Sequence, residues 1–84
     1  MEKRIGSISI LISNRDIIAQ VNQILSEFAP FILARQGLPL HERGIHFISL
    51  IIEGSTNDIS ALTGKLGRLP HVEAKSMVAK YTSM

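Results

Sequence analysis

The order in which two hydrophobic periodicities alternate constrains the fold of this 84-residue chain more than any other feature. Residues 4–12, 31–36, 45–53 and 71–81 alternate with a period of two or are apolar on both faces, as β-strands are. Between them, two stretches repeat apolar residues every three or four positions, which is typical of amphipathic helices. The sequence therefore predicts strand, helix, strand, strand, helix, strand within one domain, residues 1–84.

The first helix has a predicted start, an end and an apolar stripe. Ser13 and Asn14 are candidate caps, and Ser13 with Asp16 has the spacing of a capping box. Pro30 ends the helix near Phe28 or Ala29, because proline disfavours helical geometry in the preceding residue. The stripe that should face the sheet consists of Ile17, Val21, Ile24, Leu25 and Phe28.

The second helix is defined in the same way. Pro70 ends it, and Gly64 and Gly67 weaken it, so we interpret both glycines as sites of close packing. The segment from Gly64 to Arg68 lacks the residue order of a phosphate-binding loop. Its cap is one of three neighbouring residues, Ser55, Thr56 and Asn57, and its stripe consists of Ile59, Leu62, Leu66 and Leu69.

This element order predicts an α+β, ferredoxin-like βαββαβ sandwich, with a four-stranded antiparallel sheet and both helices on one face. A segment rich in turn formers, residues 37–44, should connect the second and third strands. The helix-free face would then expose an apolar patch, and such patches usually mark interaction surfaces. We expect a homo-oligomer, either a dimer or a tetramer, whose interface contains Ile5, Leu11, Ile45, Phe47 and Ile51.

Composition excludes several function classes. The net charge is +2 with scattered basic residues, which does not indicate direct nucleic-acid binding, and Phe47 is the one aromatic residue placed to stack a base. The absence of cysteine excludes disulfides, thiolate metal sites and cysteine nucleophiles. No apolar run approaches the ~20 residues that span a bilayer. We expect a cytoplasmic protein without membrane contact.

Several segments together resemble a known family. The stretch STNDISALTGKLGRLPHVEAKS resembles the second half of ACT-type regulatory domains. MEKR, the turn from Leu11 to Asp16, VNQIL, ILARQGLP and ISALTGKLGRLP resemble an ACT-like family of stand-alone regulators in the iron-only hydrogenase system. That family is related to the C-terminal domain of nickel-responsive regulators. The resemblance implies an ACT-like fold, oligomerisation through the sheet and a regulatory role beside hydrogenase genes.

The sequence also departs from these relatives. Amino-acid-binding ACT domains commonly have Pro-Gly after the Asn-Arg of the first turn, whereas Asp16 and Ile17 stand here. Nickel-responsive regulators use several histidines and a cysteine as ligands, and they carry a DNA-binding arm. This chain has no cysteine and no such arm. An effect on transcription would therefore pass through a partner, either a transcription protein or a hydrogenase-maturation protein.

Two candidate sites remain. Ser13, Asn14, Arg15 and Asp16 could hold a small anionic or zwitterionic ligand at the first turn, where it meets a neighbouring subunit. The alternative is an ordinary helix cap with a salt-bridged arginine. The second candidate is a metal site that combines histidines across subunits, against the alternative of solvated side chains. Its ligands would be His41, His46 and His71.

The sequence thus favours a regulatory oligomer that senses a small ligand. The rival hypothesis is a structural scaffold that binds a partner protein and no ligand. No Ser/His/Asp set or other nucleophile–base pair is evident, so we expect no catalytic residue, no cofactor and no bound metal.

Overall fold

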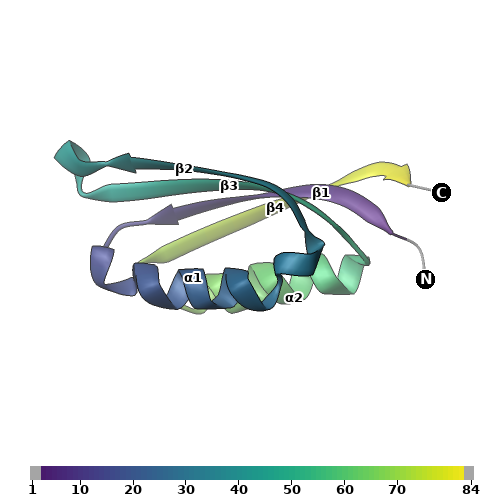
Figure 1. Ribbon diagram of the computed structural model, residues 1–84, viewed down its shortest axis with the longest axis horizontal. Coiled ribbons are helices and arrows are strands. Elements are labelled where there is room, and N and C mark those ends of the chain that lie inside the picture. Colours follow the sequence, from purple (N-terminus) through teal and green to yellow (C-terminus); the bar gives the residue numbers. More distant parts are fainter. Residues whose placement is uncertain (1–2, 83–84) are drawn as a thin grey trace.

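The computed structural model describes residues 3–82 and consists of one sheet and two helices. The strands follow the order β2-β3-β1-β4, and all neighbours are antiparallel. Both helices lie on the same face of the sheet (Figure 1), which confirms the predicted α+β, ferredoxin-like class. The elements are β1 (Arg4–Ile12), α1 (Ile18–Glu27), β2 (Ile32–Leu40), β3 (Ile45–Gly54), α2 (Thr56–Gly67) and β4 (Val72–Thr82).

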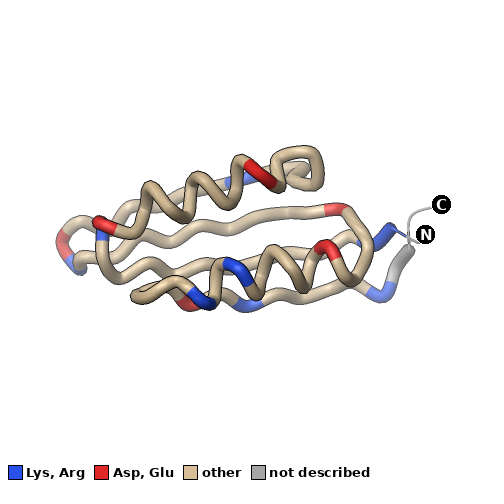
Figure 2. The backbone as a smooth tube through the Cα atoms, turned by 90° about the horizontal axis from the view of Figure 1, so that it is seen from below, with Lys and Arg blue, Asp and Glu red and all other residues tan. Residues whose placement is uncertain are grey.

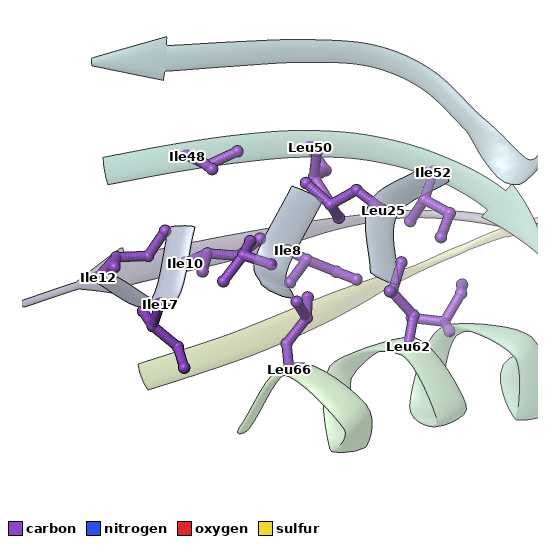
Figure 3. Close-up of a cluster of buried hydrophobic side chains, with 12 residues drawn as sticks. Ile8, Ile10, Ile12, Ile17, Leu25, Ile48, Leu50, Ile52, Leu62 and Leu66 are labelled. Atoms are coloured by element: carbon purple, nitrogen blue, oxygen red, sulfur yellow. The ribbon is translucent and has the colours of Figure 1, made fainter. Parts of the chain in front are cut away.

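The core is a layer of aliphatic side chains between the sheet and the helices. Alternate residues of β1 and β3 point into it, because successive side chains of a strand lie on opposite faces. Ile8 is paired with Leu50 and Ile10 with Ile48, so both central strands contribute to the same layer. Figure 3 shows this cluster, whose buried members are Ile8, Ile10, Ile12, Ile17, Val21, Leu25, Ile48, Leu50, Ile52, Ile59, Leu62 and Leu66.

The helix starts differ in part from the prediction. In α2 the capping box is present: Ser55 accepts a hydrogen bond from the Asp58 backbone N–H, and Asp58 accepts one from the Ser55 N–H. At the first helix a 3₁₀ turn, Arg15–Ile17, precedes α1, and Asn14 is its cap. The predicted capping box of Ser13 is wrong, since the Ser13 hydroxyl donates to the backbone carbonyl of His71.

The second strand is longer than predicted. We expected it to end at Gln36, but β2 continues to Leu40, and the turn contains only the 3₁₀ residues His41–Arg43 and Gly44. An edge strand tolerates Pro39 because proline lacks only the N–H that would donate to a ladder. Gly44 adopts a left-handed conformation, with φ 68°, that closes this hairpin. The hairpin lies at one end of the long axis, beside the turn between β1 and α1 (Figure 1).

The glycines of α2 do not have the packing role we expected. A Cβ atom built on Gly67 would meet nothing within 4 Å, and one on Gly64 would lie 3.9 Å from the Arg68 guanidinium. Close packing of a glycine occurs instead in β1. A Cβ atom on Gly6 would lie 2.6 Å from the Met77 carbonyl oxygen.

We therefore expect Gly64→Ala to stabilise the protein and Gly6→Ala to destabilise it. Alanine in a helix is favoured over glycine by about 0.8–1 kcal/mol, whereas overpacking a closed site costs about 1–3 kcal/mol. Urea unfolding of both variants, followed by circular dichroism, measures the two free energies of unfolding. Equal shifts in the same direction would contradict this packing.

A second pair of variants tests the two caps. Removing a side-chain cap costs about 1 kcal/mol, so both Asn14→Ala and Ser55→Ala should lower the free energy of unfolding by this amount. Ser13→Ala should cost less, because its exposed hydroxyl bond to the His71 carbonyl is 3.3 Å long and the Ser13 N–H already reaches the same oxygen. A larger loss in Ser13→Ala than in Asn14→Ala would contradict the cap assignment.

Candidate functional site

The turn between β1 and α1 is fixed from two sides. The Ser13 backbone N–H donates to the His71 carbonyl oxygen at 2.9 Å, which ties the turn to the start of β4. His71 has a positive φ of 64°, a conformation that non-glycine residues rarely adopt. The side chain of Asn14 accepts a hydrogen bond from the Asp16 N–H at 2.9 Å. The turn is therefore a defined structure and not a loose loop.

These hydrogen bonds occupy several of the main-chain N–H groups that the predicted anion site would use. The N–H groups of Ser13 and Asp16 already have acceptors, and the Ile17 N–H donates to the Asn14 carbonyl at 3.2 Å. Few main-chain donors are left for a ligand. An anion at this turn would depend mainly on side chains, and Asn14 still offers its amide nitrogen as a donor because only its oxygen is engaged.

The turn forms one wall of a cavity of about 340 Å³, and the β2–β3 hairpin forms the other wall. Three of the four predicted ligand residues, Ser13, Asn14 and Arg15, line this cavity. The sequence did not indicate that two histidines join them. The polar lining residues are Ser13, Asn14, Arg15, His41 and His46.

Asp16 bonds to Asn14 through its N–H but is not among the residues that line the cavity. None of the lining residues is acidic, and Arg15 is among them; its guanidinium is the group that matters for charge. Within residues 3–82, that guanidinium has no hydrogen bond or ion pair. The predicted alternative of a salt-bridged arginine is thus not realised among these residues, and the cavity has a cationic character.

His46 is held against the neighbouring strand. It lies on the helix side of β3, opposite Ile12 of β1 and Pro39 of β2. A Cβ atom on Gly37 would be 3.3 Å from its Nε2 atom, so the missing side chain of Gly37 leaves room for the imidazole. The position of His46 is therefore set by strand register, which a sequence pattern alone does not specify.

The three histidines do not form one cluster. His41 and His46 line the cavity, whereas His71 lies in the turn directly before β4 and is not among the lining residues. In the part of the chain from residue 3 to 82, no three His, Cys, Asp or Glu side chains lie close enough together to hold a metal ion.

The second candidate surface is the helix-free face of the sheet. Strand register places Phe47 between Leu11 and Leu38, and it places Ile51 between Ser7 and Ala34. Phe47 is 38% exposed and Ile51 is 41% exposed, while Ile5, Leu11 and Ile45 are half-buried. All five predicted interface residues thus lie on this face, although their role in an interface stays a prediction.

Two further exposed apolar residues lie on this face. Leu38 is 56% exposed and Met77 is 61% exposed. Leu38 was missed because residues 37–44 were interpreted as a loop, so their alternation was not used. Met77 alternates with Val78 in β4, and its pairing with Ser7 of β1 places it on this face.

Charged residues show no concentration of one sign along the elements. Figure 2 shows acidic and basic residues interspersed over helices and strands, with both signs at the hairpin end. Between residues 3 and 82 there is no helix with the length and apolar character to cross a bilayer.

Comparison with solved structures supports the fold. The uncharacterized protein TM1266 from Thermotoga maritima is 34% identical, with a TM-score of 0.90, and the match covers 94% of this chain and 100% of that chain. The ACT domain from the GTP pyrophosphokinase of Chlorobium tepidum is 18% identical, with a TM-score of 0.70, over 94% of this chain and 89% of that chain. An unknown protein from Galdieria sulphuraria is 17% identical, with a TM-score of 0.64, and here the match spans 98% of this chain and 48% of that one.

No curated protein matches the sequence. The family model "TM1266-like: Iron-only hydrogenase system regulator, putative" matches residues 4–76, which is most of the domain. The four strands and two helices of this chain agree with the ACT-like fold expected from the sequence resemblance. This chain belongs to the TM1266-like family, which is described as regulators of the iron-only hydrogenase system.

Proposed function

We propose that this chain is a non-catalytic regulatory module of the iron-only hydrogenase system that acts as a homo-oligomer and senses a small ligand. The observation that carries the proposal is the family match over residues 4–76, combined with an uncovered apolar sheet face. Its proposed place of action is the cytoplasm. A relation to nickel-responsive regulators stays a prediction.

The size of the open face supports self-association. Four strands about 4.8 Å apart, each about nine residues long at ~3.3 Å per residue, make a face of roughly 600 Å². Two stacked copies would bury on the order of 1,200 Å² in total, the lower limit of a stable specific interface. A dimer through this face, or a tetramer built from such dimers, is the proposed assembly.

The middle of this face is polar. Ser9 of β1 lies between Ser49 of β3 and Lys75 of β4, and Gln36 of β2 follows beyond Ser49. This row separates the apolar row of Phe47 from that of Ile51. Buried hydroxyl groups need hydrogen-bond partners, so two copies would stack in a register that pairs these rows. The polar row therefore supports one defined register between two stacked sheets, whereas a uniformly apolar face would allow several.

The position of Ile45 supports a link between ligand and assembly. It lines the cavity, and it also belongs to the helix-free face, opposite Leu40. A ligand that favours one arrangement of the hairpin would therefore favour one arrangement of the interface. Such coupling would transmit ligand binding to the subunit assembly.

The second candidate function is a scaffold that binds a partner protein without a ligand. The exposure of Leu38 and Met77 favours it, because a transcription or hydrogenase-maturation protein could cover the same face. Interspersed charges, visible in Figure 2, argue against direct binding of nucleic acid by either function.

Phe47→Asp should dissociate the oligomer while the domain stays folded. A charge in the apolar row of Phe47 should cost at least about 2 kcal/mol on association, which corresponds to roughly a thirtyfold weaker dimer. Sedimentation velocity over a concentration series measures the assembly, and circular dichroism checks the fold. Ala61→Asp is the matched control, because it adds the same charge on the exposed surface of α2. A wild-type monomer at tens of micromolar would contradict the proposed assembly.

The regulatory role is tested in a host that expresses an iron-only hydrogenase. We expect deletion of the gene to change hydrogenase transcript level or activity, and we expect the wild-type chain and Ala61→Asp to restore it. Phe47→Asp should fail to restore it. Unchanged transcript and activity after deletion would contradict the regulatory function.

We expect the purified protein to contain no stoichiometric nickel, zinc or iron and to have no intrinsic catalytic activity. A pair of histidines offers two ligands, whereas structural zinc sites have four and catalytic zinc sites have three. Elemental analysis after purification from the native host, together with native mass spectrometry, measures any retained metal. One equivalent that is lost in His41→Ala or His46→Ala would contradict this expectation.

A further inference from the structure

We infer that the cavity between the β1–α1 turn and the β2–β3 hairpin binds a small organic anion, a carboxylate or phosphate monoester carried on an apolar body. His41 and His46 of the hairpin hold this anion together with Arg15. The inference rests on the proposed ligand-sensing function and gives it a ligand class. It also places the site within one chain, not only between subunits.

The charge of the cavity favours an anion. Arg15 contributes a permanent positive charge, and no carboxylate lies among the lining residues. The nearest acidic residues in sequence, Asp16 and Glu42, are both outside the lining, and Glu42 instead lines an adjoining hollow on the hairpin that shares Pro39 and His41 with the cavity. A cationic ligand would find no counter-charge here.

The hydrogen-bonding groups favour the same class. Arginine offers five N–H donors in a fork that matches carboxylate and phosphate oxygens. Each histidine ring carries at least one N–H donor, and the amide nitrogen of Asn14 adds another. Donors thus outnumber acceptors on the side chains that line the cavity. An acceptor-rich group such as a carboxylate or phosphate satisfies this excess.

The hairpin is needed for this site. The N–H groups of Ser13, Asp16 and Ile17 in the first turn already have acceptors, so few main-chain donors are left to surround an anion. The histidines come from the opposite wall, and the missing side chain of Gly37 in β2 leaves room for the ring of His46. Two walls of donors can enclose an oxyanion, whereas the turn alone would present Arg15 to solvent.

The remaining lining limits the ligand body. Ile18 and Pro39 supply apolar surface beside the buried Ile12, which suits a small hydrocarbon or aromatic group. A volume of about 340 Å³ corresponds to roughly ten water-sized groups at ~30 Å³ each. It lies at the small end of known ligand sites, which begin at about 300 Å³. A compound with a single ring and one anionic group matches this space.

The test is a titration of the ¹⁵N-labelled protein with benzoate, phenyl phosphate and benzylamine, followed by two-dimensional NMR. Benzoate and phenyl phosphate distinguish the two oxyanions, and benzylamine has a similar body with the opposite charge. We expect at least one anion to shift the signals of residues 13–15, 41 and 46, together with the ring signals of both histidines. Benzylamine should shift none of them.

Variants then assign the contacts. Arg15→Gln and the double variant His41→Ala/His46→Ala should each weaken the bound anion at least tenfold, as expected for charge-assisted hydrogen bonds. Arg43→Gln is the matched control. Like Arg15→Gln it removes one positive charge, and Arg43 lies on the hairpin between the two histidines, but Arg43 does not line the cavity. It should change the dissociation constant less than twofold. If the histidine variant unfolds, the wild-type ring signals still report on their contact with the anion.

Each other outcome overturns the inference in a distinguishable way. Binding that shifts residues 13–15 but neither histidine would exclude the hairpin wall and leave the ligand-sensing function intact. Binding that shifts Phe47 and Ile51 first would place the ligand at the sheet face. No shift with any anion at millimolar concentration, in a protein that still assembles, would overturn the ligand class and favour the scaffold.

Discussion

The structure depends on the burial of one row of aliphatic side chains from each of the two central strands beneath two helices. Ile8 and Ile10 of β1 pair with Leu50 and Ile48 of β3, and all four are fully buried. Since strand side chains alternate, this burial forces the intervening residues onto the opposite face. Phe47 therefore lies outward beside the buried Ile48, and Ile51 lies outward between the buried Leu50 and Ile52. The core and the candidate interface are consequences of the same alternation.

Local sequence signals predicted the fold well because the periods of β1, β3 and both helices are strong. They failed where tertiary pairing overrides local preference. Gly37 and Pro39 are turn formers, yet pairing with β3 extends the edge strand through both. At the first helix, Ser13 has the chemistry of a cap, but its N–H and hydroxyl bind His71, 58 residues away. No local pattern contains that contact.

The candidate site was predictable in one half only. The polar turn at Asn14 and Arg15 stands out in sequence because it follows a strand and opens a helix. The other half, the hairpin with His41 and His46, depends on the length of β2. If β2 ended at Gln36, His41 would lie in a long connection whose path the sequence does not specify. Its actual position follows from the pairing of Leu40 with Ile45 and of Ile12 with His46. Strand register, and not residue type, completes the cavity.

The first residues of β3 connect the two candidate surfaces. His46 belongs to the cavity and Phe47 to the helix-free face, while Ile45 contributes to both. A ligand shifts an assembly equilibrium only if it binds the two assembly states with different affinity. That difference requires a structural element whose position matters to both sites, and a rigid strand of alternating side chains meets this requirement. A small change in the hairpin at His46 would move Phe47 with it, because adjacent residues of one strand cannot shift independently.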